Sequence, residues 1–320
     1  MARIQEAEWI WRDGELIPWR DATVHVLSLA VQFGSSVFEG IRCYATPAGP
    51  AIFRLPEHLR RLDDSCRIYR IELPYTAAQL TRACIETIDR NALDSCYVRP
   101  MVLRGYGAPG MFPAGSPIET YICCFPWGTY LGEGALEAGV DVCVSTWHRP
   151  APNTFPALAK AAGHYNNAQL IKMEAVAHGY AEAIALAPDG TVSEGSGQNL
   201  FLVRDGIVIT PPIDGTALSG ITRDAILEIA RDLGIPTREQ IVQREALYTA
   251  DELFFTGTAA EVTPIRSVDR ITVGCGRAGE LTRVLQREFM RIAQGETADR
   301  HGWLTHVRSE NAALVAENYG

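Results

Sequence analysis

A lysine among small residues is the first candidate for covalent chemistry. Lys160 lies in the segment NTFPALAKAAGHYNN, and it is one of only two lysines among 29 basic residues. An amine can lose its proton and attack a carbonyl carbon, whereas a guanidinium cannot. Alanine and glycine cannot pair an ammonium charge, so burial there should favour the neutral amine. The segment therefore indicates a Schiff-base lysine, although a lysine that extends from a helix to solvent, as is expected of Lys172 in QLIKMEAVAHG, would leave a similar pattern.

Three further features would complete a site for a pyridoxal cofactor, which needs an anion cradle, a carboxylate for the ring nitrogen and a wall for the ring. The segment LSGITRDAILEIARDLG predicts a helix whose first amides, at Ile221 and Thr222, could bind a phosphate. Glu194, in TVSEGSGQNLF, lies on a tight turn that could hold its carboxylate against a ring nitrogen. The small residues at 257–260 permit close approach of backbone amides to a ligand. Taken singly, these features also fit a helix cap, a solvated turn and a strand exit.

Other nucleotide and hydrolase motifs are not supported. The pattern GxGxxG occurs at 105–110 and at 274–279. No helix begins on the first because Pro109 lies inside it, and no βαβ unit follows the second. The sequence has no GxxxxGK[ST] loop, no HExxH helix and no GxSxG elbow. Dinucleotide binding and hydrolase chemistry are therefore not indicated.

The elements that would position these residues begin with grouped strands. EWIW and ELIP, joined through Asp13-Gly14, predict a hairpin, and ATVHVLS and FEGIRCY predict further strands. Two amphipathic helices are expected next, one beginning near Pro56 and one over TAAQLTRACIETIDRN, before strands return in CYVRPMVLRG and TYICCFPW. Strands on one side and helices on the other predict a small α+β domain over 1–126.

The second half mixes helices, strands and hairpins. Glycine-rich residues at 127–138 predict an interdomain connector, and 139–320 a large cofactor-binding domain. Hairpins are expected at Asp189-Gly190 and Asp205-Gly206. Mixed hairpins and helices argue against a doubly wound parallel sheet. The fold class predicted for the whole chain is α+β / α/β, in two domains.

Composition excludes several classes of protein. The chain has 320 residues, a net charge of −9 and no basic run, so the electrostatic footprint of a nucleic-acid binder is missing. No window reaches the 18 apolar residues of a membrane span, and the first residues are charged throughout, which predicts a cytoplasmic protein without a membrane partner. Eight cysteines without a CxxC pair predict buried thiols rather than a metal site.

Six segments in register carry a resemblance to a known family. They are FGSSVFEGIRCY, YVRP, APNTFPALAKAAGHYNN, VSEGSGQNLF, SGITRDA and FTGTAAEVTPIRSVD. From about Trp9 to Trp303 the chain resembles the branched-chain amino acid aminotransferases, which are class IV pyridoxal-phosphate enzymes. The resemblance implies fold type IV, with pyridoxal 5'-phosphate in the interdomain cleft, and a homodimer or a higher assembly of dimers in which a neighbouring subunit completes the site. It implies ping-pong transfer of the amino group of leucine, isoleucine or valine to 2-oxoglutarate, so the partners would be small amino acids and 2-oxo acids.

The same resemblance assigns roles to individual residues. Lys160 would bind the cofactor covalently and move a proton, and Glu194 would pair with the pyridine nitrogen. The implied cofactor-binding residues are Arg61, Lys160, Tyr165, Glu194, Ile221, Thr222 and Thr258. The implied substrate-binding residues are Phe38, Gly40, Tyr97, Arg99, Trp127, Tyr130, Thr258, Ala259 and Ala260. Among these, Arg99 would receive the distal carboxylate of glutamate, and no metal is implied.

One departure from the family and two alternatives to it stay open. Bacterial members commonly have tyrosine where this chain has Phe33, so a hydroxyl near the Arg99 side of the pocket is absent. The same fold supports D-amino acid or (R)-amine transaminases and aminodeoxychorismate lyases, but the EGIR and YVRP segments favour the branched-chain enzymes. From another class, the chain could be a non-catalytic pyridoxal-phosphate carrier or a subunit scaffold.

Overall fold

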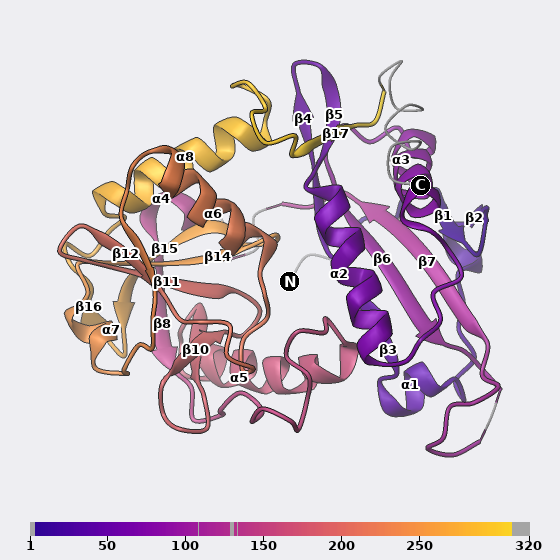
Figure 1. Ribbon diagram of the computed structural model, residues 1–320, viewed down its shortest axis with the longest axis horizontal. Coiled ribbons are helices and arrows are strands. Elements are labelled where there is room, and N and C mark those ends of the chain that lie inside the picture. Colours follow the sequence, from indigo (N-terminus) through magenta and orange to yellow (C-terminus); the bar gives the residue numbers. More distant parts are fainter. Residues whose placement is uncertain (1–3, 108, 129–130, 133, 309–320) are drawn as a thin grey trace. The chain divides into compact units, whose positions relative to one another are not determined.

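The computed structural model describes residues 4–107, 109–128, 131–132 and 134–308 (Figure 1). The chain divides into two compact units. The first consists of Met1–Gly128, Ala159–Gly163 and Ile292–Gly320, and the second of Thr129–Leu158 and His164–Arg291. The expected boundary at 127–138 lies near the first crossing, but the chain also returns to the first unit twice. The linear division into independently folding domains stays a prediction.

The first unit is built on one antiparallel sheet. Its strands lie in the order β17-β5-β4-β6-β7-β1-β2, and β3 pairs with β6. In chain order its elements are β1 (Trp9–Arg12), β2 (Glu15–Pro18), η1 (Trp19–Asp21), α1 (Leu29–Phe33), β3 (Ser36–Phe38), β4 (Ile41–Thr46), β5 (Gly49–Phe53), α2 (Leu55–Ile68), α3 (Ala77–Arg90), β6 (Cys96–Arg104), β7 (Ile118–Phe125) and β17 (Leu304–His306).

Two helices cover this sheet and close its core. α2 packs on α3 and on β3, and α3 packs on β1, β6 and β7 (Figure 1). Leu62 of α2 and Ile88 of α3 meet Val98 of β6 in one buried apolar cluster. α3 begins with a capping box, in which the Thr76 hydroxyl accepts from the Gln79 amide and the Gln79 side chain accepts from the Thr76 amide. The expected α+β arrangement of this half is confirmed.

Two strand predictions need correction. ATVHVLS forms no strand, because Ser28 caps a short helix instead: its side chain accepts a hydrogen bond from the Val31 amide at the start of α1. FEGIRCY does not form one continuous strand, because the ladder breaks between β3 and β4. At this break the Glu39 amide donates to the Pro100 carbonyl. The break matters for the site, because it leaves Glu39 outside both strands.

The second unit contains a mixed sheet. Its strands lie in the order β10-β9-β8-β15-β14-β11-β12-β13, with β16 paired to β15. The pairs β8 with β9, β8 with β15 and β12 with β13 are parallel. In chain order its elements are α4 (Ala135–Ala138), β8 (Val140–Val144), α5 (Tyr165–Ala177), β9 (Glu182–Leu186), β10 (Val192–Gly195), β11 (Asn199–Arg204), β12 (Ile207–Thr210), α6 (Ile221–Asp232), β13 (Thr237–Glu239), α7 (Ala246–Thr249), β14 (Glu252–Gly257), β15 (Glu261–Val268) and β16 (Ile271–Thr272). Two helices cross the division between the units: η2 (Ala162–His164) begins in the first unit, and α8 (Glu280–Ala293) ends in it.

This sheet returns toward its own start. β10 and β11 follow each other through a tight turn, in which the Gly195 amide donates to the Gln198 carbonyl at 2.7 Å. β10 is the first strand of the path β10-β9-β8-β15-β14-β11, and β11 is the last. Because a tight turn brings these two strands together, this part of the sheet curves round like a barrel. The hairpins predicted at Asp189-Gly190 and Asp205-Gly206 join β9 to β10 and β11 to β12. The mixed fold class is confirmed, and within the described ranges no helix is long and apolar enough to cross a membrane.

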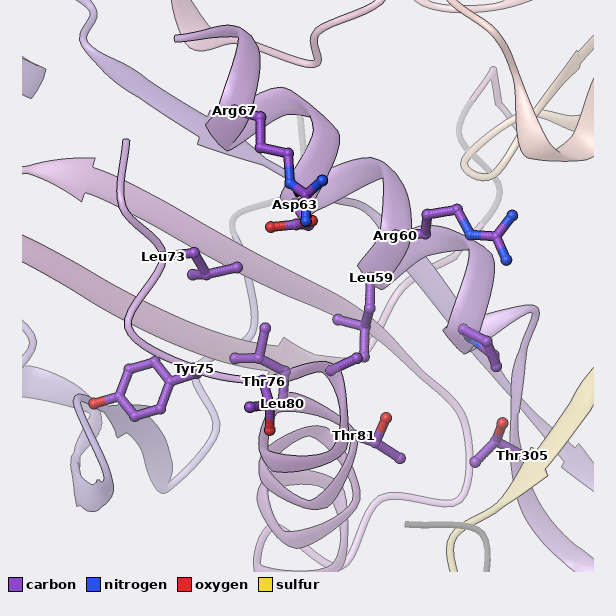
Figure 2. Close-up of a pocket in the computed structure, with 12 residues that line it drawn as sticks. Leu59, Arg60, Asp63, Arg67, Leu73, Tyr75, Thr76, Leu80, Thr81 and Thr305 are labelled. Carbon is purple, nitrogen blue, oxygen red and sulfur yellow. Dashed lines mark ion pairs between the residues drawn. The ribbon is translucent and has the colours of Figure 1, made fainter. Parts of the chain in front are cut away.

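A cavity of about 380 Å³ lies beside α2 and α3 in the first unit (Figure 2). Its floor is apolar, with Leu59, Leu73 and Leu80. At its edge Arg67 pairs with Asp63 at 2.8 Å, and the Arg60 side chain extends away from the leucines. None of the residues assigned to the active site lines it. The cavity is therefore separate from the residues expected to carry the chemistry.

Candidate active site

The backbone of Lys160 is held from two sides within the first unit. Its amide donates to the Ser65 hydroxyl of α2 at 3.0 Å, and its carbonyl accepts from the Phe38 amide at the end of β3, also at 3.0 Å. The next residue, Ala161, forms an isolated bridge with Val37. The Lys160 amine lies 5.1 Å from the centre of the Phe38 ring. The lysine thus leaves a fixed backbone and extends along an aromatic face, rather than from a helix.

Lys172, the other lysine, has a different setting in the second unit. Its amine lies 3.2 Å from the carboxylate of Glu182, which is fully buried on β9, and it also donates to the Ala181 carbonyl. These contacts tie α5 to the sheet. Lys172 therefore does more than extend to solvent from its helix, and its role is structural.

A buried ionic cluster lies next to Phe38 in the chain. The Glu39 carboxylate accepts from the Arg61 Nε at 2.7 Å and from the Arg61 Nη2 at 2.9 Å. His58 Nδ1 lies 2.7 Å from the same carboxylate. Burial would raise the pKa of Glu39, but the Arg61 charge and His58 outweigh burial and hold this pKa well below its usual range. Arg61 is therefore a cation clamped in one orientation.

Aromatic rings surround a second guanidinium. The Arg99 guanidinium carbon lies 4.7 Å from the Phe38 ring centre and 5.2 Å from that of Tyr97. Tyr97 packs on Trp127 at 4.9 Å between ring centres. Gly40 makes room for Tyr97, since a Cβ at Gly40 would lie 1.9 Å from the Tyr97 hydroxyl. Arg99 Nε is buried and has no hydrogen-bond partner among the described residues, so it can still donate to a ligand.

The Glu194 carboxylate is held by three donors in the second unit. Arg149 Nη2 lies 3.0 Å from one of its oxygens. The other oxygen accepts from the Asn199 amide nitrogen at 3.3 Å and from the Leu218 backbone amide at 3.2 Å. The ladder between β9 and β10 shifts register between Val192 and Glu194. These contacts keep the carboxylate in one place on a buried strand.

The N-terminus of α6 is tied to Glu194 through Asn199. The Asn199 amide donates both to Glu194 and to the Leu218 carbonyl, the latter at 2.9 Å. A Cβ at Gly220 would lie 1.8 Å from the Asn199 side-chain oxygen, so only glycine fits at this N-cap. Gly220 has no side chain to cap the helix, and the amides of Ile221 and Thr222 follow it directly. This helix start has the chemistry of an anion site.

The turn between β14 and β15 lies beside the turn that joins β10 to β11. A Cβ at Gly257, the last residue of β14, would lie 3.6 Å from the Gly197 carbonyl. Thr258, Ala259 and Ala260 follow, and the Ala260 carbonyl accepts from the Thr263 hydroxyl at 2.6 Å. The predicted small-residue turn therefore exists, and its backbone is held in place.

The start of α5 joins this group through Arg149. Arg149 Nη1 donates to the Asn167 side-chain oxygen at 3.0 Å, in the same helical turn as the half-buried Tyr165. His164, just before Tyr165, packs edge-on against Phe155 at 5.2 Å. Burial, with Arg149 nearby, lowers the pKa of His164 to about 4. Arg149 thus organises both the carboxylate and the helix start.

The residues proposed from the sequence fall into two connected groups. The first unit brings together Arg61, Phe38, Gly40, Tyr97, Arg99, Trp127 and Lys160. The second unit brings together Tyr165, Glu194, Ile221, Thr222, Thr258, Ala259 and Ala260. Tyr130 lies outside the described residues, and Phe33 is exposed at the end of α1.

Sequence reasoning missed the groups that hold these residues. They are Glu39, His58, Ser65, Arg149 and Asn199. A signal existed for one helix: positions 58, 61 and 65 share a face at helical spacing. No comparable signal marks Arg149, because its partner Glu194 lies far along the chain.

Comparison with known proteins gives a consistent result. Residues 36–268 match the family model for amino-transferase class IV. The chain is 51% identical to the branched-chain-amino-acid aminotransferase of Escherichia coli (strain K12) over 304 residues, which cover 95% of this chain and 98% of that protein. The crystal structure of an E. coli branched-chain amino acid aminotransferase superposes with a TM-score of 0.93 at 51% identity and covers 95% of this chain and 100% of that chain.

A further solved structure is that of the branched-chain aminotransferase from the thermophilic archaeon Thermoproteus uzoniensis with norvaline. It is 39% identical, with a TM-score of 0.90, and it covers 95% of this chain and 100% of that chain. The likeness thus spans both units and every segment that carries a candidate residue. A lysine, a clamped carboxylate and a helix start suited to phosphate, in a chain with these relatives, place the protein in the class IV aminotransferase family, among its branched-chain-amino-acid enzymes.

Proposed function

We propose that the protein transfers the amino group of leucine, isoleucine or valine to 2-oxoglutarate through pyridoxal phosphate, in two half-reactions on one site. The observation that carries the proposal is the presence, in one chain, of a backbone-fixed Lys160 in the first unit and of a Glu194 carboxylate held by Arg149, Asn199 and Leu218 in the second. The identity over nearly the whole chain to branched-chain enzymes favours this activity over a D-amino acid or (R)-amine transaminase.

The residues present fit pyridoxal phosphate. Gly220 places no side chain over the start of α6, and a larger residue there would collide with Asn199. Arg61 adds a cation that Glu39 orients. We propose that Tyr165, Thr222 and Thr258 add hydroxyl groups for the phosphate. When bound, the cofactor supplies an aldehyde carbon and an electron-withdrawing ring.

The two catalytic side chains have distinct tasks. Lys160 would bind the cofactor through its amine and would then move a proton to and from the substrate Cα. Its fixed backbone limits the number of positions that the amine can take. Glu194, which lies beside Arg149, would hold a proton on the ring nitrogen. Both roles require that the two groups serve the same cofactor molecule.

One substrate pocket has to accept an apolar side chain and a carboxylate. Phe38, Tyr97 and Trp127 supply aromatic faces for the branched side chain. Arg99 Nε is buried and still able to donate, and it would donate a hydrogen bond to the distal carboxylate of glutamate. The backbone at Thr258, Ala259 and Ala260 would bind the α-carboxylate, and Gly40 keeps Tyr97 in place.

We infer that a second copy of the chain covers an apolar surface of the first unit. Met111 is 81% exposed, Phe112 80% and Val26 69%. The His25 ring stacks on Tyr106 at 4.1 Å, so the two segments that carry these side chains adjoin. A patch of this kind is unusual on a monomer. A cytoplasmic location is part of the same proposal.

Reduction and half-reaction measurements test the function. The purified protein should be yellow, and borohydride should attach the cofactor to Lys160. Peptide mapping that finds the label on Lys172, or finds none, contradicts the assignment. Single-turnover reactions should show branched-chain L-amino acids and glutamate as donors and little reaction with D-alanine or an (R)-aryl amine. Light scattering should give the mass of a dimer or a multiple of it, reduced by Phe112→Ser.

A further inference from the structure

The Glu39 carboxylate is a fully buried charge in contact with the first group of site residues. Its side chain has no exposed surface, and it is surrounded by Arg61, His58 and the Gly40 amide, which lies 3.3 Å away. A buried carboxylate is costly unless such partners satisfy it. Apolar residues could fill this space, so packing alone does not explain why a charged side chain is found here.

Glu39 links β6 to α2 next to the backbone segment that contains Lys160. Its amide donates to Pro100 of β6, and the preceding residue, Phe38, donates to the Lys160 carbonyl. Its carboxylate reaches His58 and Arg61, which lie one turn apart on α2. The side chain therefore fixes the orientation of an α2 cation relative to the segment that carries Lys160.

Glu39 occupies only part of the Arg61 guanidinium. It accepts from Nε and Nη2, which is the bidentate arrangement of a planar fork. A guanidinium has five N–H donors in fixed directions, and the Glu39 carboxylate accepts from two of them. Because the fork is rigid, clamping one edge sets the direction of the others.

His58 completes the clamp without adding charge. Burial lowers the pKa of His58, and this effect outweighs the opposite effect of Glu39, while the charges of Arg61 and Lys160 act in the same direction as burial. A neutral histidine can only donate from Nδ1 to an ionised carboxylate, which accepts only. The cluster thus contains one anion and one cation, and Arg61 keeps its charge.

We propose that Glu39, with His58 behind it, is a positioning residue that directs Arg61 toward the phosphate of the cofactor. The inference rests on the proposed assignment of Arg61 to that phosphate. Glu39 touches neither cofactor nor substrate in this role. It acts by clamping one edge of the Arg61 guanidinium, which fixes the orientation of that cation.

The test compares two ligands that differ only in the phosphate. Apoprotein is titrated with pyridoxal phosphate and with pyridoxal, and the two dissociation constants are measured by absorbance. Glu39→Gln should reduce the preference for pyridoxal phosphate by about tenfold to a hundredfold, because a charge-assisted contact is lost. Glu57→Gln is the matched control, since Glu57 pairs with Arg54 at 2.9 Å on the same helix; it should leave the preference unchanged.

A double-mutant comparison separates this inference from the proposed function. If Glu39 acts through Arg61, Glu39→Gln should have no further effect on the preference in an Arg61→Ala background. Full additivity, or equal weakening of both ligands by Glu39→Gln, overturns the positioning role. An Arg61→Ala variant that keeps the preference overturns the phosphate assignment itself. Should Glu39→Gln fail to fold, Glu39→Asp, which keeps the charge but is too short for both contacts, should show a smaller loss, and an unchanged preference there contradicts the proposal.

Discussion

The chemistry of a lysine depends on what holds its backbone and what surrounds its amine. Lys160 has its amide and carbonyl fixed by Ser65 and Phe38, and its amine lies against an aromatic ring. Lys172 lies on a helix and forms an ion pair with Glu182. The scarcity of lysine and the small neighbours were enough to single out Lys160 in the sequence. The fixing groups were not visible there, because they lie far away in the chain.

Glu194 carries the first prediction at this scale. Glu194→Gln should leave the cofactor largely bound but slow the first half-reaction by about three orders of magnitude, or roughly 4 kcal/mol, because a neutral amide cannot keep the ring nitrogen protonated. Stopped-flow absorbance with leucine measures this step. Glu194→Asp retains the charge and should recover part of the rate. Near-normal turnover in Glu194→Gln would show that another group organises the ring nitrogen.

The second prediction at this scale concerns Arg99. Arg99→Ala should raise the Michaelis constant for 2-oxoglutarate by about tenfold to a hundredfold and that for leucine much less, because only the former presents a distal carboxylate. Arg104→Ala, on the same strand, is the control: Arg104 donates to the Tyr69 and Arg70 carbonyls, so its loss should affect stability rather than substrate preference. Equal losses for both substrates in Arg99→Ala would make Arg99 a structural residue.

At the scale of elements, α2 explains how one helix serves the site. Its apolar positions, including Leu59 and Leu62, face the core. Its polar positions His58, Arg61 and Ser65 face Glu39 and the Lys160 backbone. Helical periodicity in the sequence predicted the helix and its apolar face. The spacing of the polar face was visible in the sequence, but its partners could not be predicted, because they belong to a strand break and to a distant segment.

Ser65 allows a test of this link between α2 and the lysine segment. Its hydroxyl donates to the Arg61 carbonyl at 2.8 Å and accepts from the Lys160 amide. Ser65→Ala should lower the free energy of unfolding by about 1 kcal/mol, because the partly buried Lys160 amide loses its acceptor. It should also slow the uptake of pyridoxal phosphate by the apoprotein, followed by absorbance.

Thr87→Ala provides the matched control. The Thr87 hydroxyl is buried on α3 and donates to the Ala83 carbonyl of the same helix at 2.6 Å. This variant should be destabilised without slower cofactor uptake. Equal uptake rates in Ser65→Ala and Thr87→Ala would mean that the hydroxyl of Ser65 contributes only to folding.

For the whole molecule, the sequence predicted the order of most elements but not how the chain is shared between the units. Hairpin dipeptides and amphipathic helices are local signals, and they identified the two long helices of the first unit, α2 and α3, and the hairpins of the second. The return of Ala159–Gly163 to the first unit depends on pairing with Val37 and Phe38, which lie far away in the chain. Such pairing leaves no local pattern. Although Lys160 lies just before α5 in the chain, it therefore belongs to a different unit from Glu194.

Acid stability is the property of the whole molecule that a buried histidine should control. Burial and the nearby Arg149 lower the pKa of His164 to about 4 from 6.5. Between these values the unfolded chain binds a proton that the folded chain does not, so stability is complete above pH 6.5 and falls as the pH drops toward 4. The loss attributable to His164 should approach about 3 kcal/mol. Urea unfolding of the apoprotein from about pH 7.5 to about pH 4 measures it.

The pH slope of two histidine variants decides whether His164 is the cause. His164→Phe keeps an aromatic ring beside Phe155 but cannot bind a proton, so the unfolding free energy should depend less steeply on pH between 6.5 and 4. His178→Phe replaces an exposed histidine at the other end of α5 and should leave the slope of the parent protein unchanged. Carboxylates paired in the folded protein, such as Glu39, would then account for the loss that remains at lower pH, because their pKa values are held down. A slope that is the same in His164→Phe and in the parent protein would show that the proton uptake occurs elsewhere.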